Sequence, residues 1–394
     1  LITTTHVVEV RYRLMISRFS IAQKFLPWKS PACVLLNNQL GQQVNQQCKQ
    51  NHRKNSRRYQ KRAAARRRRK HDFYMEIVLL LILAVVLFFV SKLSKIEKTK
   101  LDMDKIEVNE DISQESRKIM KGYQTIAMFG LDNRSNGNLS QGRSDVIMLA
   151  NINNDTKEVK LVSVYRDTYL DTGDGIFQKC NAAYAKGGPE QAISMLNVNL
   201  DLNITDYVTV DFNSIIECVD LLGGVDMEIT DDEASLMTGY IRELNELTGN
   251  KAENLTQGGT YTLNGVQACA YARIRYGGGD DYRRTERQRT VLTAMVKKAQ
   301  QSDLTTVNKL INEVCGDIQT SFSNAELLAL ASQVFQYSIG DTTGFPFTKT
   351  TRVLSKKTGD VVIPCDLSDN VKELHIFLYE DSAYTASDTV KTEQ

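Results

Sequence analysis

The sequence predicts an α/β domain of three layers, with a mixed central sheet between helices, preceded by one N-terminal transmembrane helix. Three observations support this prediction. Strand-like apolar segments alternate with helix-like segments from Thr125 onward, which is typical of a layered α/β fold. Two of the strands are joined by the polar turn "NNDTK", which makes them antiparallel neighbours and the sheet mixed. Upstream, residues 77–90 form an uninterrupted apolar run of 14 residues.

The apolar run predicts a single membrane span over residues 73–93. It follows a segment with 11 Lys and Arg between Arg53 and Lys70, and such a basic flank is retained on the cytoplasmic side. The alternative is a cleaved signal peptide, but the sequence after the run, "SKLSKIEKTK", lacks a small-residue cleavage site. The basic segment also resembles a patch for nucleic acid or anionic lipid, although a topology signal explains it more simply.

Charge and composition divide the chain at the predicted span. Residues 1–72 hold 17 Lys and Arg against 2 Asp and Glu, a charge of +15, which leaves −13 for the rest because the formal total is +2. Only His375 among the four histidines follows the span, so a histidine-based triad or a His-rich metal site has almost nothing to work with there. The five cysteines after the span lack C-x-x-C spacing, and a bridge between Cys315 and Cys365 is left open.

The elements follow in order after the span. We expect "YQTIAMFG" to be a buried strand, "VIMLANI" and "EVKLVSV" a hairpin, "PEQAISMLNVNL" a helix that opens at Pro189, "YVTVDF" a strand, "NSIIECVDLLGG" a helix closed by glycine, and "VDMEI" a strand. The expected segments are 1–72, cytoplasmic, basic and largely disordered; 73–93, transmembrane; 94–122, a juxtamembrane stalk; 123–300, the main domain; 301–380, the C-terminal part of the outer domain; and 381–394, a disordered tail.

The hairpin is expected to bring charged residues to one edge of the sheet. If its turn is centred between Asp155 and Thr156, Asp145 of "GRSD" faces Arg166 of "YRDTY" at the open end. Ligands usually bind at strand ends in α/β sheets. The same edge then collects Arg143, Asp167 and, from the loop "GLDNRS", Asp132 and Arg134.

A second group of charges lies in "RIRYGGGDDYRRTERQR", which holds six arginines. The pattern of "YARIRY" favours an extended segment, so Arg273 and Arg275 would point the same way. The following residues have helical periodicity, with residues 284, 288, 291 and 295 on one stripe. Val291 and Met295 face the core, so Arg284 and Gln288 also point inward, and an inward arginine without an acid on its own face needs an external anion.

The remaining arginines of this segment lie off the stripe. These are Arg283, Arg287 and Arg289, and they can pair with Asp280, Asp281 or Glu286. Ordinary salt bridges would explain the segment on its own, but not its combination with the hairpin. Guanidinium groups bind phosphate oxygens bidentately, and two separated carboxylates could hold Mg²⁺ against the same phosphates. The combination fits a diphosphate better than a monocarboxylate.

Residues from about Thr125 to Lys298 resemble the LytR–CpsA–Psr family of membrane-anchored cell-wall enzymes. The resemblance is carried, in the family's order, by "GLDNR", "GRSDVIML", "SVYRD", "KCNAAYAKGGPE", "VDLLGGVDM", "LNGVQACAYARIR" and "RRTERQR". Two positions depart from the family's pattern. Tyr165 stands where the family usually has proline, and Cys180 stands in a usual "KIN". Neither departure removes a charged group.

The resemblance implies a phosphotransferase that moves a glycopolymer, such as teichoic acid or capsule, from a polyprenyl-pyrophosphate carrier to peptidoglycan. It implies a phosphodiester product, release of polyprenyl phosphate, and a location outside the membrane of a Gram-positive-type envelope. Asp132 and Asp145 match the carboxylates associated with Mg²⁺ (or Mn²⁺), and Asp132 is also the preferred proton acceptor. The residues that match the pyrophosphate clamp are Arg166, Arg273, Arg275, Arg284 and Gln288, with Arg134 and Arg143 as further members; the catalytic set is Asp132, Asp145, Arg166, Arg273 and Arg275.

Two other functions use the same residues. A non-catalytic receptor for lipid-linked intermediates needs the arginines but no base, and a polyprenyl-pyrophosphate hydrolase uses water as the nucleophile. The sequence leaves open the identity of the polymer, the acceptor sugar and the oligomeric state.

Overall fold

The computed structural model describes most of the chain after residue 100. The described residues are 41–42, 46, 49–50, 97–98, 101–131, 139, 142–173, 175–275, 280–303, 306, 309–310 and 318–392. Contacts divide the chain into two units, Leu1–Val85 and Val86–Gln394. Five residues of the first unit are described, and all five are helical. The fold below is that of the second unit.

The predicted membrane span, 73–93, lies outside the described residues. Within the part of the chain that the structure describes, no helix has both the length and the apolar character required to cross a bilayer. The span, the basic segment before it and the topology therefore stay predictions.

The second unit is built on a seven-stranded mixed sheet, which confirms the predicted α/β domain with a mixed central sheet. Its strand order is β1-β10-β7-β2-β3-β4-β11. The pairs β2–β3, β3–β4 and β7–β10 are antiparallel, whereas β2–β7, β4–β11 and β1–β10 are parallel. The strands are β1 (Glu97–Lys98), β2 (Tyr123–Leu131), β3 (Ser144–Asn153), β4 (Glu158–Val164), β7 (Asp206–Asp211), β10 (Ile318–Thr320) and β11 (Ser338–Phe345).

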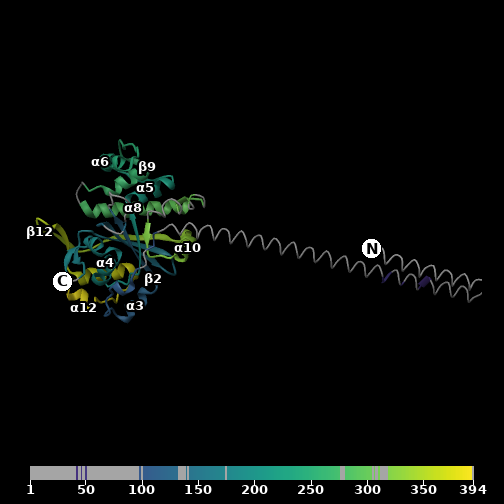
Figure 1. Cartoon of the computed structure of the whole chain (residues 1–394), viewed down its shortest axis with the longest axis horizontal. Coiled ribbons are helices and arrows are strands. Elements are labelled where there is room, and N and C mark those ends of the chain that lie inside the picture. The colour runs from purple at the N-terminus through teal and green to yellow at the C-terminus, as the bar shows by residue number, and fades with distance from the viewer. Residues whose placement is uncertain are drawn as a thin grey trace, which may run out of the picture. The chain divides into compact units, whose positions relative to one another are not determined.

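Helices cover both faces of this sheet (Figure 1). Alternate strand residues point to opposite sides, and the strands present apolar side chains on both, so each face packs against helices. Phe129 and Leu149 pack with α4 and α11 on one face, while Met148 and Ile126 pack with α8 and α10 on the other. The first face carries α3 (Gln114–Met120), α4 (Ala182–Leu200), α11 (Leu367–Tyr379) and α12 (Asp388–Thr392). The second carries α5 (Phe212–Leu221), α6 (Asp231–Thr248), α7 (Gly265–Arg273), α8 (Asp280–Gln301) and α10 (Asn324–Ser332).

Three small two-stranded sheets and two 3₁₀ turns complete the described fold. The small sheets are β5 (Tyr169–Asp171) with β6 (Phe177–Lys179), β8 (Val225–Ile229) with β9 (Gly259–Leu263), and β12 (Lys349–Ser355) with β13 (Gly359–Pro364). The 3₁₀ turns are η1 (Met103–Lys105) and η3 (Val334–Gln336).

The register of the β3–β4 hairpin is the one predicted from its turn. Met148 pairs with Ser163 and Leu149 with Val162, and both pairs agree with a turn centred between residues 155 and 156. The side chain of Asn153 fixes this turn by accepting hydrogen bonds from the backbone N–H groups of residues 155 and 156, at 2.9 and 3.0 Å. The hairpin therefore sets which residues meet at its open end.

The segment 381–394, expected as a disordered tail, is in fact packed against the domain as far as residue 392. Tyr384 and Val390 are buried. The buried carboxylate of Asp201 accepts hydrogen bonds from the Tyr384 hydroxyl and from the backbone N–H of Ser387, the latter at 2.8 Å. The prediction was wrong because the polar residues of this tail satisfy a buried acid instead of facing solvent.

The expected stalk, 94–122, also belongs to the domain, because residues 97–98 form β1 of the central sheet and Leu101 packs against the main core. Asn109 donates to Asp201 Oδ1 at 2.6 Å, and Met120 of α3 joins the main core. Residues after 300 likewise supply β10 and β11 to the central sheet, so residue 300 is not a boundary of the fold. From Leu101 onward, the alternating Lys and acidic residues that suggested a stalk lie on the exposed face of this segment, and its other face packs against the domain.

Candidate functional site

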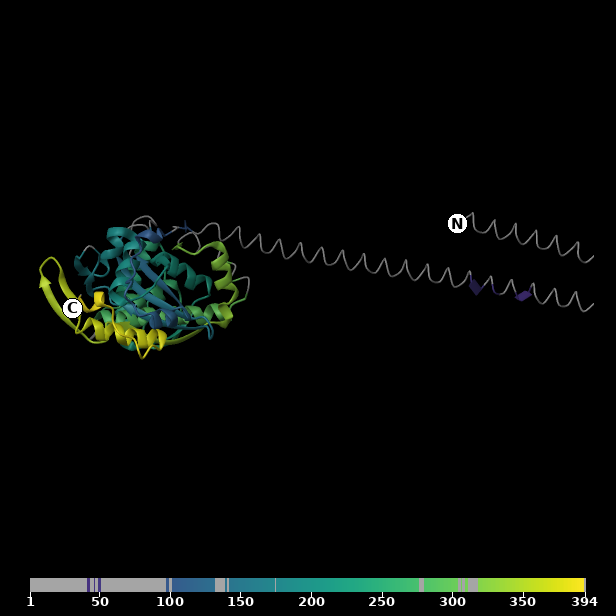
Figure 2. The same cartoon turned by 90° about the horizontal axis from the view of Figure 1, so that it is seen from below.

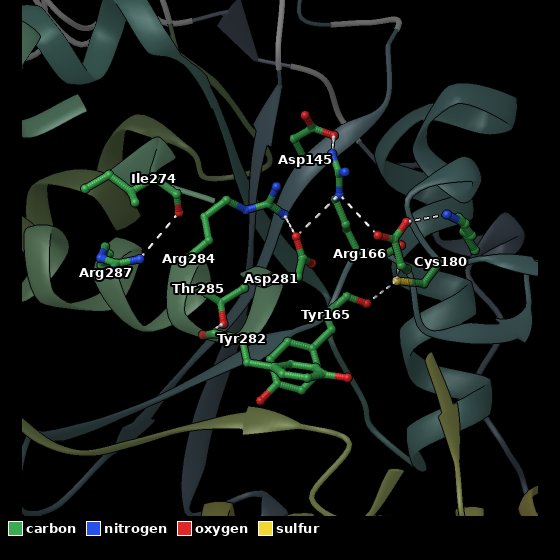
Figure 3. Close-up of polar contacts among 12 residues, drawn as sticks. Asp145, Tyr165, Arg166, Cys180, Ile274, Asp281, Tyr282, Arg284, Thr285 and Arg287 are labelled. Carbon is green, nitrogen blue, oxygen red and sulfur yellow. Dashed lines mark hydrogen bonds and ion pairs between the residues drawn. The ribbon is translucent and has the colours of Figure 1, made fainter. Parts of the chain in front are cut away.

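Arg166 and Asp145 meet at the open end of the hairpin, as the register predicts (Figure 3). Arg166 Nη1 donates to Asp145 Oδ1 at 2.8 Å. Arg166 Nε lies 3.6 Å from Asp167 Oδ2, and Lys179 Nζ lies 2.9 Å from the other oxygen of Asp167. The loop after β4 thus carries a half-buried arginine among carboxylates.

Both positions that depart from the family's pattern support this loop. The fully buried thiol of Cys180 donates to the backbone carbonyls of Tyr165, at 3.1 Å, and Arg166, at 3.3 Å (Figure 3). Burial raises the pKa of the Cys180 thiol, which keeps it protonated and able to donate. The two departures are therefore in direct contact, and together they hold the backbone that presents Arg166.

Two aromatic rings join this loop to the start of α8. The rings of Tyr165 and Tyr282 meet edge to face with centroids 4.6 Å apart (Figure 3). The ammonium of Lys349 lies 5.0 Å from the Tyr165 ring and 4.6 Å from the Tyr282 ring, within the range of cation–π attraction. These contacts bring the residues next to Tyr165 and Tyr282, namely Arg166 and Asp281, to the same place.

Asp281 lies between the loop and α8. Its Oδ1 is 2.6 Å from Arg284 Nη2 and 3.9 Å from Arg166 Nε (Figure 3). The sequence interpretation placed no acid on the inward face of Arg284, and this was wrong because residues three apart on a helix are neighbours. That spacing was the signal in the sequence that would have identified Asp281.

Burial governs the electrostatics of this cluster. Arg284 is 4% exposed, and burial lowers its pKa to about 10, with Asp281 opposing the shift and Arg166 and Arg275 adding to it. Burial also raises the pKa of the Asp281 carboxyl, although Arg284 and Arg166 oppose this. For Arg166, burial alone would lower the pKa, but Asp145, Asp167 and Asp281 together raise it. The cluster therefore holds charges in a poorly solvated place.

Several of these charged groups have donor or acceptor atoms that form no hydrogen bond among the described residues. Arg166 Nε, Arg284 Nε and Asp281 Oδ2 are buried without a hydrogen-bond partner among the described residues. An unsatisfied buried polar group costs about 1–3 kcal/mol, and more when it is charged. Because guanidinium N–H groups only donate, the missing partner of the two arginines is an acceptor such as a phosphate oxygen.

The expected extended conformation of "YARIRY" is wrong, because α7 continues through Arg273. The helix begins with a capping box in which Asn264 and Gln267 exchange hydrogen bonds with each other's backbone N–H groups, at 3.0 and 3.1 Å. Arg273 at its end lies 3.1 Å from Glu243 and 5.2 Å from the Phe212 ring. Arg275 instead lies within electrostatic range of Asp281 and Arg284, so the two arginines diverge.

The inward stripe of α8 is confirmed, but two arginines placed off it are also buried. Arg287 pairs with Glu233 of α6 at 3.0 Å, not with the acids of its own segment. Arg289 is 7% exposed, and its Nε and Nη1 are without hydrogen-bond partners among the described residues. Burial lowers its pKa, while the nearby Tyr165 opposes this shift. Arg283, which also lies off the stripe, is exposed.

Two cavities adjoin the cluster. A polar cleft of about 790 Å³ is lined by Arg143, Asp145, Arg166, Asp167, Phe177, Gln178, Lys179, Asn181, Ala182, Lys357 and Thr358. An apolar cavity of about 120 Å³ lies between the sheet and the helices α5, α7 and α8. The side chains that line it include Met148, Phe212, Ala272, Gln288, Val291 and Met295. Gln288 Oε1 is buried there without a hydrogen-bond partner among the described residues.

Not all predicted site residues can be placed. Asp132 and Arg134 lie outside the described residues, whereas Arg143 lines the polar cleft with Asp145 and Arg166. The part of the chain that the structure describes contains no group of three or more His, Cys, Asp or Glu side chains arranged to hold a metal ion. Mg²⁺ often takes only one or two protein carboxylates and completes its shell with phosphates and water. The carboxylate of Asp145, open to the cleft, fits that mode.

Cys365 is an exposed free thiol, and Cys315 lies outside the described residues. Cys365 therefore does not form the disulfide bond with Cys315 that the sequence left open.

The fold and site define a class of protein: a mixed α/β domain that gathers arginines and carboxylates at one sheet edge, beside an apolar cavity. The model of the LytR_cpsA_psr family matches residues 83–352, and the chain belongs to this family.

Its relatives include cell-wall transferases. The chain is 30% identical over 210 residues to the polyisoprenyl-teichoic acid–peptidoglycan teichoic acid transferase TagU of Enterococcus faecalis, a match over 52% of this chain and 64% of TagU. It is 30% identical over 195 residues to the corresponding transferase TagV of Bacillus subtilis, over 48% of each chain. The matches thus span less than two thirds of either relative.

A solved structure of TagT, with bound octaprenyl pyrophosphate lipid, shares the fold. The TM-score is 0.51 at 20% identity, over 71% of this chain and 99% of that chain. This likeness shows the fold, and the ligand belongs to TagT.

Proposed function

We propose that the protein is a phosphotransferase that moves a glycopolymer from a polyprenyl-pyrophosphate carrier to peptidoglycan. The product is a phosphodiester link, and polyprenyl phosphate is released. Membership of the family supports this proposal, as do relatives that are named for transferring teichoic acid to peptidoglycan.

The observation that carries the proposal is that α8 passes from the charged cluster to the apolar cavity within a few turns. Arg284 belongs to the charged cluster with unsatisfied donors. One turn later Gln288 lines the apolar cavity, and Val291 and Met295 line it further along the helix. One helix thus connects a site for an anion to a site for a hydrocarbon, which suits a lipid whose head is a pyrophosphate.

The transfer step follows from this placement. A hydroxyl oxygen of the acceptor sugar attacks the phosphorus bonded to the glycan, and the bond from that phosphorus to the bridging oxygen breaks. Polyprenyl phosphate leaves with the bond's electron pair, and the hydroxyl proton passes to a carboxylate. The candidate proton acceptors are Asp132 and Asp281. The Oδ2 atom of Asp281 has no hydrogen-bond partner among the described residues.

Arginines stabilise the negative charge that develops on the phosphates. Arg166 and Arg284 both lie beside Asp281 Oδ1, at 3.9 and 2.6 Å, and Arg275 lies within electrostatic range of Arg284. Arg143 and Gln288 extend the set toward the polar cleft and the apolar cavity. Arg134 stays in the proposal although it is outside the described residues, and Arg273 would exchange Glu243 for a phosphate.

Asp132 and Asp145 would hold the Mg²⁺ (or Mn²⁺) ion of this proposal. The ion would neutralise phosphate charge and orient the pyrophosphate. We place the domain outside the cell membrane, anchored by the single span 73–93 with its N-terminus in the cytoplasm. The apolar cavity, at about 120 Å³, is smaller than the ~300–1,000 Å³ of typical ligand pockets, so a long tail requires α5 and α8 to move away from the sheet.

Replacing Arg284 by glutamine tests the proposal. Because Arg284 supplies buried donors to the phosphates, kcat/KM for transfer from a lipid-linked glycan to peptidoglycan should fall about 100-fold. The matched control is Arg283→Ala, which removes an exposed arginine one residue earlier and should leave transfer unchanged. Wild-type transfer by folded Arg284→Gln protein would refute the proposed site.

A further inference from the structure

We propose that the polar cleft beside Arg166 continues into a second anion subsite, which the turn between β12 and β13 completes. This subsite would bind phosphate groups within the donor polymer, beyond its pyrophosphate. The proposal rests on the proposed function and narrows its substrate class to a glycopolymer that carries phosphates along its chain, in contrast to a neutral polysaccharide.

The charge balance of the cleft supports an anionic occupant. Its lining holds four cations, two of which are engaged: Arg166 pairs with Asp145 and Lys179 with Asp167. The other two, Arg143 and Lys357, have no ion pair among the described residues. The cleft therefore has an excess of two positive charges, although the chain after residue 72 is acidic. Local positive charge in an acidic domain favours a negatively charged ligand.

The β12–β13 hairpin is fixed to the site and is not a loose appendage. Figure 2 shows it projecting from the body of the domain. At its base Val361 and Val362 are buried, and Val362 N–H donates to the backbone carbonyl of Asp167 at 2.9 Å. Thr168 forms a bridge with Val362 as well. The hairpin is thus bonded to the residues that directly follow Arg166.

The turn of the hairpin holds Lys357 at the cleft. The Ser355 side chain accepts a hydrogen bond from the backbone N–H of Thr358 at 3.0 Å, and Gly359 follows with the positive φ that closes such a turn. Lys357 and Thr358 line the cleft, whereas Lys356 does not. Two adjacent exposed lysines therefore differ in this one respect.

The size and origin of the cleft point to a role in choosing the polymer. Its volume of about 790 Å³ is near the upper end of the ~300–1,000 Å³ range of ligand sites, which leaves room beyond a pyrophosphate for further units of the donor. Residues 353–364 lie beyond the family match, which ends at residue 352. A hairpin that is attached to the shared site, and whose turn and second strand lie outside the family match, is suited to a specificity element.

The test compares two donors with full-length protein in nanodiscs and one peptidoglycan acceptor. One donor carries a lipid-linked disaccharide extended with poly(glycerol phosphate), and the other carries the same disaccharide extended with neutral sugars. Lys357→Glu should lower kcat/KM about tenfold for the phosphate-bearing donor and less than about twofold for the neutral donor, as expected for a reversed, partly solvated charge. Lys356→Glu is the matched control and should leave both donors within about twofold of wild type.

Three results would overturn the subsite. Lys357→Glu could leave kcat/KM unchanged for both donors. It could lower kcat/KM equally for both, which would place Lys357 at the acceptor. Lys356→Glu could have the same effect as Lys357→Glu, which would indicate a general effect of surface charge. In each of these the wild-type protein still transfers glycan, so the proposed function stands. A folded wild-type protein that transfers neither donor would refute the proposed function itself.

Discussion

Asp281 contacts arginines from two different elements, and this makes it the residue that organises the cluster. It lies beside Arg284 on α8 and near Arg166 in the loop after β4. A carboxylate in this position neutralises the two arginines while no substrate is bound. It also repels an incoming phosphate, so its effects on binding and on chemistry have opposite signs.

Replacing Asp281 by asparagine should separate these two effects. Binding of polyprenyl pyrophosphate should be unchanged or tighter, because a repelling charge is removed. The turnover number kcat should fall about 100-fold if Asp281 accepts the proton. Single-turnover transfer and equilibrium binding measure the two quantities. Wild-type kcat in Asp281→Asn would assign proton acceptance elsewhere, with Asp132 as the candidate.

At the residue scale, local pattern predicted some contacts and missed others. The Asp145–Arg166 pair followed from strand register, and the inward direction of Arg284 followed from helical period. The partner of Arg287, Glu233, lies on α6, which is not adjacent to α8 in sequence. Contacts between such elements depend on tertiary packing, and the local sequence does not contain that information.

At the element scale, α7 and α8 determine the site more than the strands do. The sequence interpretation gave weight to the arginine alternation in "YARIRY" and missed the capping box and alanines that make residues 265–273 a helix. As a result Arg273 was expected beside Arg275, whereas the helix end directs it to Glu243. The strands were easier to predict, because their apolar runs and turns are local signals.

The apolar cavity between these helices and the sheet gives a prediction about the lipid tail. Ala272→Phe places a large ring in the cavity that Ala272 lines. If the tail enters there, the KM for a long-chain donor should rise about tenfold, whereas a donor with a short chain of two isoprene units should be much less affected. Steady-state transfer with the two donors measures the difference. Equal effects on both would place the tail outside this cavity.

At the scale of the whole molecule, the segments at both ends of the domain meet at one buried acid. Asp201 accepts hydrogen bonds from Asn109 near the start of the domain and from Tyr384 and Ser387 near its end. His375 stacks on Tyr384 with ring centroids 3.7 Å apart, and its Nε2 lies 3.1 Å from the Leu200 carbonyl. Both end segments are rich in polar residues, some of which make these buried contacts, and composition alone therefore suggested an exposed stalk and a disordered tail.

His375 should make stability depend on pH. Burial lowers its pKa from 6.5 to about 4, although the Leu200 carbonyl and the Asp201 carboxylate oppose this. The unfolded chain therefore binds a proton at higher pH than the folded protein does, and stability falls as the pH falls from 6.5 toward 4. Between pH 7 and pH 5 the loss should be about 2 kcal/mol.

The variant His375→Gln removes this titration and keeps a side-chain donor for the Leu200 carbonyl. Denaturant unfolding at pH 7 and pH 5 should show the difference in pH dependence between the variant and the wild type. A wild-type protein with the same pH dependence as His375→Gln would show that folding does not lower the pKa of His375.

The central claim is that this domain transfers a phosphoglycan and does not hydrolyse its carrier. The most direct measurement follows a donor whose glycan-linked phosphorus is isotopically labelled, incubated with full-length protein and peptidoglycan. The account predicts that the label appears in a phosphodiester on peptidoglycan, with polyprenyl monophosphate as the released product. Label found only in free phosphorylated glycan or inorganic phosphate would contradict transfer and identify a hydrolase, and label that stays in the donor would leave a receptor.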